Sequence, residues 1–253
     1  MYLVYNKKTI QKVLNLYKKE TYKFSFIGAV LTKVQKGKIY ANHKKNPSCA
    51  FVIHKFGWAQ IIGKKDSDFI NLLILKIKNF EFKQKIRFFN FNLKGLGSVN
   101  IIKGKRIQYN FKKLSEYKIK KNLYKIKKIT DRNFYQVSKQ CKLELNKRFW
   151  NSRKHFFLNS FGYCLQKKSK FIAACYSCAN YEKQREVDIV TSEKFRNQGL
   201  AKLLASQFIL ECKRKGLEPK WDCYKDNFAS NKLALSLGFK KVLKEYNFII
   251  VSA

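Results

Sequence analysis

The fold is decided by the stretch Arg196-Asn197-Gln198-Gly199-Leu200-Ala201. It lies between a strand-like run, Glu186 to Thr191, and an amphipathic run, Leu200 to Lys213, that predicts a helix. Unpaired backbone N–H groups and the positive end of the helix dipole meet at such a helix start, so the stretch predicts an anion-binding loop. No Gly-Lys-Ser/Thr follows it and it has one glycine where a dinucleotide fingerprint has three, which disfavours nucleoside triphosphate and NAD sites.

A second motif lies downstream, in the stretch Asn227-Phe228-Ala229-Ser230-Asn231-Lys232-Leu233-Ala234-Leu235-Ser236-Leu237-Gly238-Phe239. From about residue 124 onward, hydrophobic periodicity and turn residues predict the order β-α-α-β-β-β-α-β-α-β. This order and the two motifs together resemble the GNAT superfamily of N-acetyltransferases over residues 124 to 251. The stretch Pro219-Lys220-Trp221-Asp222-Cys223, with the aromatic-rich N-terminal half, further resembles a two-domain bacterial GNAT subfamily.

The resemblance implies an α/β (α+β) fold with a mixed, splayed central sheet, and acetyl-CoA as co-substrate without a metal. In that family a Gln/Arg-x-x-Gly-x-Gly/Ala loop binds the acyl-CoA pyrophosphate, and Arg196, Gly199 and Ala201 occupy its fixed positions here. The implied contacts with acetyl-CoA are Ile189, Val190 and Thr191 for the pantetheine arm, Arg196, Asn197, Gln198, Gly199, Leu200 and Ala201 for the pyrophosphate, and Asn227 and Ser230 for either. Asn227 and Ser230 have an equally good interpretation as helix-capping groups.

Two carboxylates are candidates for the general base that direct acyl transfer to an amine requires. Glu186 and Asp188 are two residues apart in a predicted strand, so we expect them to share one face. A face shared by two carboxylates can raise the pKa of one of them toward neutrality, which suits a base. The family's base often lies early on this strand, which favours Glu186. The alternative is that both are solvated strand acids that pair with the many lysines.

The sequence departs from the family at Ala234, where a tyrosine commonly protonates the leaving thiolate. A CoA thiolate with a pKa near ~8.5 is a tolerable leaving group, so the missing acid slows transfer without forbidding it. Tyr224 or Cys223, at the end of the preceding predicted strand, are the substitutes. A non-catalytic acyl-CoA-binding module is therefore one alternative to an N-acetyltransferase that acts on a small-molecule or peptide amine.

The net charge of +39 raises the possibility of a nucleic-acid partner. Residues 1–130 carry 31 basic and 5 acidic side chains, and residues 131–253 carry 24 and 11. Only 8 of the 55 basic residues are arginine, and the chain is rich in residues with A/T-rich codons, so a low-GC genome also explains the excess of lysine. Nucleic acid is therefore not favoured, and an RNA-linked amine, as in aminoacyl-tRNA, remains the second alternative for the acceptor.

Seven cysteines lie scattered in apolar patterns, as expected of reduced, buried thiols in a cytoplasmic protein. Cys175 and Cys178 form a C-x-x-C pair, but no second pair or nearby histidine completes a zinc site. Residues 1–9 lack the apolar core of a signal peptide and no apolar run approaches ~18 residues, so we expect neither secretion nor membrane insertion. A homodimer is one assembly that the sequence allows.

We predict two domains, with residues 1–120 as a mixed α/β domain that shapes the acceptor site and residues 121–253 as the acyl-CoA-binding catalytic domain. The elements expected in the first are helices at 6–20 and 66–80, and strands at 24–33, 37–41, 48–54, 85–92 and 106–112. Those expected in the second are helices at 130–147, 151–158, 200–213 and 228–237, and strands at 124–129, 161–166, 171–181, 186–191, 219–223 and 241–251.

Overall fold

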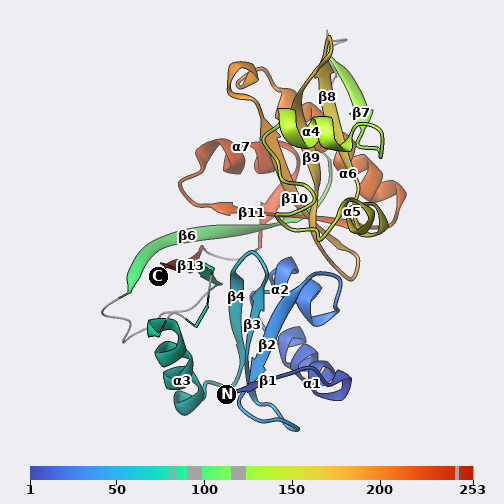
Figure 1. The fold of residues 1–253 in the computed structure, drawn as a ribbon. Coiled ribbons are helices and arrows are strands. Elements are labelled where there is room, and N and C mark those ends of the chain that lie inside the picture. Colours follow the sequence, from blue (N-terminus) through green and yellow to red (C-terminus); the bar gives the residue numbers. More distant parts are fainter. Residues whose placement is uncertain (80, 83, 90–98, 115–123, 243–244, 253) are drawn as a thin grey trace. The chain divides into compact units, whose positions relative to one another are not determined.

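The computed structural model describes residues 1–79, 81–82, 84–89, 99–114, 124–242 and 245–252. The chain forms two compact units (Figure 1), the first of Met1–Arg106 with Glu245–Ala253 and the second of Ile107–Lys244. Each unit contains helices and a β-sheet, which confirms the predicted α/β class. The predicted boundary between residues 120 and 121 lies outside the described residues.

The first unit has a sheet in the order β1-β2-β3-β4-β5-β13-β6. Figure 1 shows the red β13 beside the green β6, although the two strands are far apart in the sequence. Its elements are β1 (Tyr2–Leu3), α1 (Lys7–Lys18), α2 (Ser25–Leu31), β2 (Gly37–Ala41), β3 (Cys49–His54), β4 (Trp58–Gly63), α3 (Ser67–Lys78), β5 (Ile86–Phe89), residues 100–106 of β6 (Asn100–Phe111), and β13 (Tyr246–Ser252).

Helices cover both faces of this first sheet. Phe51 and Ile53 of β3 pack with Phe69 and Leu73 of α3 in one buried cluster. On the other face His54 meets the ring of Phe26 in α2, with centroids 5.1 Å apart. The alternation of β3 side chains between two apolar layers explains why the whole strand is buried.

Residues 24–33 were predicted as a strand, and the structure corrects this to helix α2. All seven residues of α2 are buried. A helix that is buried on every side shows no polar stripe, so its sequence cannot be distinguished by periodicity from a buried strand. The strand β4 has no counterpart in the prediction.

The second unit has a sheet in the order β6-β11-β10-β9-β8-β7, with β12 paired to residues 109–111 of β6. The pairs β7–β8, β8–β9, β9–β10 and β6–β12 are antiparallel, and β10 and β11 run parallel. Its remaining elements are β7 (Lys125–Lys128), α4 (Phe134–Gln140), α5 (Arg153–Asn159), β8 (Gly162–Lys167), β9 (Lys170–Tyr181), β10 (Gln184–Thr191), the 3-10 turn η1 (Glu193–Phe195), α6 (Leu200–Arg214), β11 (Glu218–Tyr224), α7 (Phe228–Ser236) and β12 (Phe239–Lys241).

Two helical layers enclose the second sheet as well. Leu204 and Phe208 of α6 pack with Cys175 of β9 in the main buried cluster of this unit, called the α6 cluster below. On the opposite face the ring of Phe156 in α5 lies 6.1 Å from that of Tyr176, the next residue along β9. Trp150 donates a hydrogen bond from Nε1 to the carbonyl of Ser177 (3.1 Å) on the same face as α5.

The predicted helix at 130–147 is shorter in the structure, where α4 covers seven residues. Thr130 does not cap it; the backbone N–H of Thr130 instead donates to the side chain of Asn133 (2.9 Å). The helix stops because Lys142 adopts a left-handed conformation (φ 53°) and the Ser138 hydroxyl donates to the carbonyl of Leu143. Local side-chain hydrogen bonds therefore override a weak helical pattern.

The predicted strand at 241–251 is two strands. β12 pairs with β6 in the second unit, and β13 pairs with β5 and with residues 100–106 of β6 in the first. This part of the sequence thus contributes a strand to each unit, and the alternation of its apolar residues does not reveal the division. Among the described residues, no helix is long and apolar enough to cross a membrane.

Helix α6 is anchored near its C-terminal end by Glu211, whose side chain is 7% exposed. Arg214 donates to both carboxylate oxygens of Glu211, from Nε and from Nη2, at 2.8 Å each. This hydrogen bonding lowers the pKa of the Glu211 carboxyl from its ordinary value of 4.5 to about 2.

A Glu211→Gln variant is expected to be less stable than the parent by about 1–2 kcal/mol at pH 7, or roughly 2–6 °C in Tm. The pKa of Glu211 is lower in the folded chain than in the unfolded chain, so its contribution is complete well above pH 4.5 and is lost as the pH falls toward about 2. Calorimetric Tm values at pH 7 and pH 3 test this, with exposed Glu218→Gln as the control. An equal Tm difference at both pH values would show that the stabilisation does not depend on the ionisation of Glu211.

Candidate functional site

The sheet of the second unit opens between two parallel strands. β10 and β11 pair at Gln184–Glu218, Arg185–Pro219 and Glu186–Lys220. Among the described residues the two strands have no further pair, whereas β10 stays paired with β9 as far as Thr191. Residues 187–191 therefore present an unpaired backbone edge toward β11.

The residues of β10 alternate between the two faces of the sheet. Val187 and Ile189 pack against the α6 cluster. Glu186 and Asp188 alternate with them and face the side of α5, as predicted from their spacing. Glu186 is 5% exposed and belongs to the last residue pair before the strands separate.

The Arg196–Ala201 loop follows β10 at the open end of this gap. The N–H of Ser192 donates to the carbonyl of Ile172 (2.8 Å), which fastens the end of β10 to β9. Asn197 (φ 61°) and Gly199 (φ 73°) are left-handed, a conformation that asparagine and glycine tolerate best. Gly199 is the N-cap of α6 and supplies no side chain.

The backbone N–H groups of this loop are available to a ligand. No hydrogen bond within the described part of the chain uses the N–H of residues 198–201. They lie at the positive end of a fifteen-residue helix, where an anion is stabilised. The loop therefore has the local geometry that its sequence predicts.

Two side chains of the loop are held in place. Arg196 donates from Nε to the carbonyl of Thr191 (3.3 Å), and its guanidinium lies 3.8 Å from the carboxylate of Glu193. The carbonyl oxygen of the Gln198 side chain accepts a hydrogen bond from the Tyr124 hydroxyl (2.7 Å). The Oγ1 atom of Thr191 is buried without a hydrogen-bond partner among the described residues.

Asn227 and Ser230 have structural partners at the start of α7. The Asn227 side chain accepts from the N–H of Ser230 (3.1 Å), and the Ser230 hydroxyl accepts from Nε1 of Trp221 (3.0 Å). Asn227 is thus the N-cap of α7, whereas the Ser230 side chain contacts Trp221 and caps no helix. The side-chain amide of Asn227 and the hydroxyl hydrogen of Ser230 take part in neither of these two bonds, so each residue retains a donor.

Asn231, which the sequence did not single out, holds the turn between β11 and α7. Its side-chain amide donates to the carbonyls of Tyr224 (2.9 Å), Lys225 (3.1 Å) and Asn227 (2.8 Å). Its carbonyl oxygen accepts from the hydroxyl of Tyr109, which is fully buried. Burial raises the pKa of Tyr109 to about 12.

An Asn231→Ala variant is expected to lose about 2 kcal/mol of stability, or roughly 4–8 °C in Tm, because three carbonyls of the turn and a buried phenol lose their partner. Differential scanning calorimetry of the full chain measures the shift. The exposed neighbour Lys232→Ala is the control. A Tm within 1 °C of the parent would show that Asn231 does not hold the turn.

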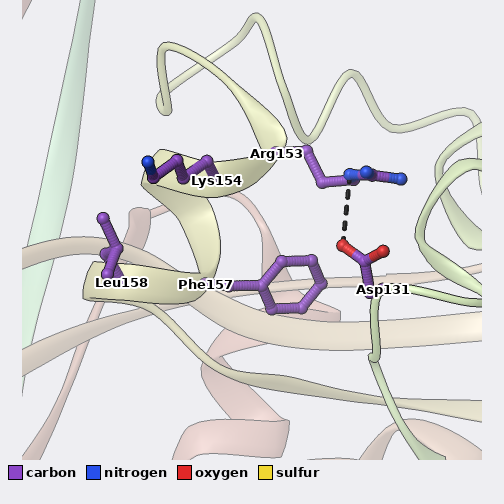
Figure 2. Close-up of a pocket in the computed structure, with 5 residues that line it drawn as sticks. All are labelled: Asp131, Arg153, Lys154, Phe157 and Leu158. Atoms are coloured by element: carbon purple, nitrogen blue, oxygen red, sulfur yellow. Dashed lines mark ion pairs between the residues drawn. The ribbon is translucent and has the colours of Figure 1, made fainter.

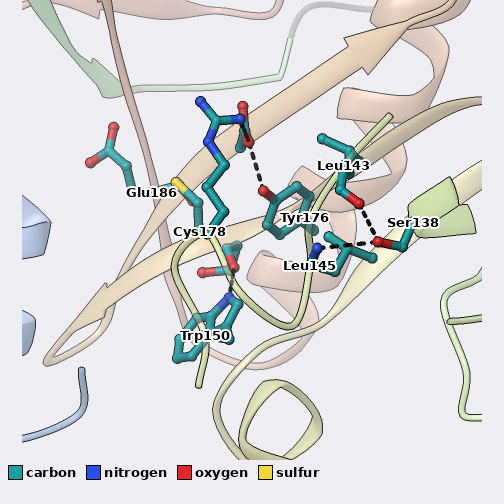
Figure 3. Close-up of polar contacts among 10 residues, drawn as sticks. Ser138, Leu143, Leu145, Trp150, Tyr176, Cys178 and Glu186 are labelled. Atoms are coloured by element: carbon teal, nitrogen blue, oxygen red, sulfur yellow. Dashed lines mark hydrogen bonds and ion pairs between the residues drawn. The ribbon is translucent and has the colours of Figure 1, made fainter. Parts of the chain in front are cut away.

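The two candidate bases have different surroundings. Asp188 accepts a hydrogen bond from the buried hydroxyl of Tyr176 (2.7 Å) and pairs with Arg148 (3.4 Å), both at Oδ2. Figure 3 shows Glu186 beside Cys178, whose thiol donates to the carbonyl of Glu186 (3.4 Å). Asp188 is therefore committed to a structural pair.

The end of β11 carries the two candidates for a proton donor to the leaving group. Cys223 is 6% exposed and belongs to the α6 cluster together with Ala234. Tyr224 alternates with Cys223 and so faces the same side of the sheet as Glu186. The role of Tyr224 as an acid stays a prediction.

A pocket of about 410 Å³ lies on α5 and the segment before α4, lined by Asp131, Arg153, Lys154, Phe157 and Leu158 (Figure 2). Arg153 pairs with Asp131 (3.2 Å). None of the predicted site residues lines this pocket. Among the described residues, no three His, Cys, Asp or Glu side chains converge as metal ligands.

Sequence reasoning missed several residues next to the predicted site. Arg148 and Tyr176, the partners of Asp188, carry no local signal because their contacts are tertiary. Tyr124 is the first residue of the predicted strand at 124–129, and its position next to Gln198 could not be read from periodicity. Asn231 had a usable signal, since it is the second asparagine of the Asn227–Phe239 motif.

Comparisons with known proteins agree with this geometry. The profile of a family described as GNAT acetyltransferase matches residues 15–249. The uncharacterized N-acetyltransferase YdfB of Bacillus subtilis (strain 168) is 26% identical over 230 residues, which are 86% of this chain and 87% of that protein. Both matches extend well into the N-terminal half, beyond the residues that carry the predicted resemblance.

Solved structures share the fold. A GCN5-related N-acetyltransferase-like protein from Streptococcus suis 89/1591 has a TM-score of 0.68 at 20% identity, over 96% of this chain and 98% of that one. A GNAT-family acetyltransferase from Colwellia psychrerythraea has a TM-score of 0.62 at 12% identity, over 100% and 99%. At these identities the likeness shows the fold alone.

Proposed function

This chain belongs to the GNAT acetyltransferase family and is an acyltransferase, and from that premise we propose that it transfers the acetyl group of acetyl-CoA to a primary amine. The acceptor in this proposal is a small molecule or a peptide, and the amine attacks the thioester directly. The observation that carries the proposal is the gap between β10 and β11, with the unpaired N–H groups of residues 198–201 at its open end.

The residues present fit acetyl-CoA, which members of this family use as co-substrate. The amides of the pantetheine arm pair with the free backbone edge of Ile189, Val190 and Thr191, and the buried Oγ1 of Thr191 offers a further polar contact. The pyrophosphate accepts from the N–H groups of residues 198–201, with Arg196 nearby. Five residues of strand, 187–191, span about 17 Å at ~3.3 Å per residue, which puts the thioester near Glu186.

Glu186 is the general base in this proposal. An amine with a pKa near ~10 is protonated at neutral pH and must lose a proton before it attacks the thioester carbon. Glu186 is buried at the point where the strands separate, which is where the thioester is proposed to lie. Glu186 takes the proton directly or through one water molecule.

The leaving group departs as the CoA thiolate. The new bond joins the amine nitrogen to the acetyl carbon, the carbon–sulfur bond breaks, and sulfur keeps the electron pair. Tyr224, which faces the same side as Glu186, gives a proton to sulfur and regains one from the amine nitrogen, which thereby becomes an amide; the side chain of Ala234 has no proton to give. Seven free, buried cysteines support a cytoplasmic location for this reaction.

Incubation of the full chain with isotopically labelled acetyl-CoA and a panel of primary amines tests the proposal. Mass spectrometry is expected to find the label on at least one amine, with one free CoA thiol released per acetyl group. Release of CoA without any acetylated amine would refute amine transfer. Acetyl-CoA that stays intact across the panel and a metabolite extract would refute the proposed reaction as a whole.

A further inference from the structure

Lys167, the last residue of β8, lies between two aromatic rings. Its Nζ atom is 5.6 Å from the ring centroid of Tyr124 and 5.2 Å from that of Phe195. An ammonium ion on the faces of aromatic rings is attracted by their quadrupoles and is held in one place. The charge of Lys167 is therefore positioned, unlike that of most surface lysines.

The two rings fix this charge next to the Arg196–Ala201 loop. Tyr124 and Phe195 are both partly buried and pack against the α6 cluster, so neither ring moves independently of the core. Phe195 directly precedes the loop, and the Tyr124 hydroxyl donates to the Gln198 side chain inside it. Lys167 is thus held by the residue that precedes the loop and by a ring that is bonded to Gln198 within it, and the available N–H groups of residues 198–201 belong to the same loop.

Lys167 has no carboxylate partner within the part of the chain that the structure describes. Glu193, two residues before Phe195, faces the guanidinium of Arg196 at 3.8 Å. The lysines at 168 and 194 add positive charge in the adjacent turns. A held cation without a counter-ion, beside helix N–H groups that are also unused, has the chemistry of a phosphate site.

We propose that Lys167, held by Tyr124 and Phe195, binds the 3′-phosphate of the CoA adenosine. This inference rests on the proposed function, in which the N–H groups of residues 198–201 bind the pyrophosphate. CoA carries one more phosphate, on the ribose, and as a monoester with a second pKa near ~6 it is close to a dianion at pH 7. A point charge such as an ammonium suits a dianion, whereas helix N–H groups suit the spread charge of a pyrophosphate.

The consequence is a choice of acyl donor. Dephospho-CoA lacks the 3′-phosphate, and an acyl group on the phosphopantetheine of a carrier protein lacks the whole adenosine. Both keep the pantetheine arm that pairs with β10, so only the Lys167 site distinguishes the first of them from CoA. The enzyme therefore selects free acetyl-CoA.

Calorimetric titration with acetyl-CoA and with acetyl-dephospho-CoA tests this on the full chain. The parent is expected to bind acetyl-CoA about 10-fold tighter than acetyl-dephospho-CoA. Lys167→Gln is expected to lose about 10-fold for acetyl-CoA and less than twofold for acetyl-dephospho-CoA, and Lys167→Arg to keep most of the preference. Lys170→Gln removes the same charge from an exposed position of the same hairpin and serves as the matched control.

Three results would overturn the inference. Equal affinity of the parent for both ligands would show that Lys167 does not bind the 3′-phosphate, and it would leave the proposed function intact. Equal losses for both ligands in Lys167→Gln, at an unchanged Tm, would assign Lys167 to the pyrophosphate instead. No binding of either ligand by the parent would refute the proposed function together with this inference. Tyr124→Leu provides a second route if Lys167→Gln fails to fold, with the same selective loss expected.

Discussion

A Glu186→Gln variant is expected to lose about 10²–10³-fold in kcat at neutral pH, while its affinity for acetyl-CoA changes by less than about twofold. The substitution keeps the size of the side chain and the backbone pairs that Glu186 makes with β9 and β11. It removes the group that is proposed to accept the proton of the attacking amine. Steady-state kinetics with the best acceptor from the amine panel, and calorimetry with acetyl-CoA, measure the two quantities separately.

Two further variants make the Glu186 result specific. Glu218→Gln makes the same chemical change at a side chain that is 60% exposed, and it is expected to keep the parental kcat. Asp188→Asn weakens the contacts to Tyr176 and Arg148, and it is expected to lower the Tm more than kcat. A kcat of Glu186→Gln within threefold of the parent would exclude Glu186 as the base.

An Ala201→Glu variant is expected to bind acetyl-CoA about 100-fold more weakly than the parent. A carboxylate at the second residue of α6 lies in the proposed pyrophosphate site, and two charges ~5 Å apart at an effective dielectric constant near ~20 repel by about 3 kcal/mol. The same carboxylate stabilises the free helix through its dipole, so the Tm is expected to stay level or rise. Loss of the ligand without loss of stability separates this prediction from misfolding.

The matched control for Ala201→Glu is Ala201→Gln. Glutamine has the same shape as glutamate and no charge, so a binding loss of less than about 10-fold is expected from bulk alone. Calorimetric dissociation constants and Tm values for the parent and both variants decide the outcome. Equal losses in the two variants would assign the effect to crowding, and unchanged binding in Ala201→Glu would place the anion elsewhere.

The fold could be predicted where local patterns coincide with tertiary packing. The strand that contains Glu186 and the helix that begins at Leu200 were predicted to within two residues, because one face of each is apolar and the loop between them has its own chemistry. The resemblance to the GNAT superfamily is confirmed by a family match over residues 15–249. The prediction of a strand at residues 24–33 was wrong because a helix with no exposed face, such as α2, shows no periodic pattern of polar residues in its sequence.

The candidate site likewise contains local features that the sequence predicts and tertiary contacts that it does not. The loop at Arg196–Ala201 could be recognised because its function depends on the backbone and on the left-handed conformation of Gly199, and both are local. The separation of β10 and β11 was expected from the resemblance, and the structure contains it. The partners of Asp188 and the stacking of Lys167 depend on contacts between residues distant in sequence, which neither spacing nor composition encodes.

Calorimetric titration of the unmodified chain with acetyl-CoA tests the central claim most directly, since every assigned role depends on that ligand in the gap between β10 and β11. The proposed site predicts one molecule per chain, a Kd on the order of micromolar, and a rise in Tm that grows with acetyl-CoA concentration. Absence of heat and of any Tm shift at millimolar acetyl-CoA would contradict it.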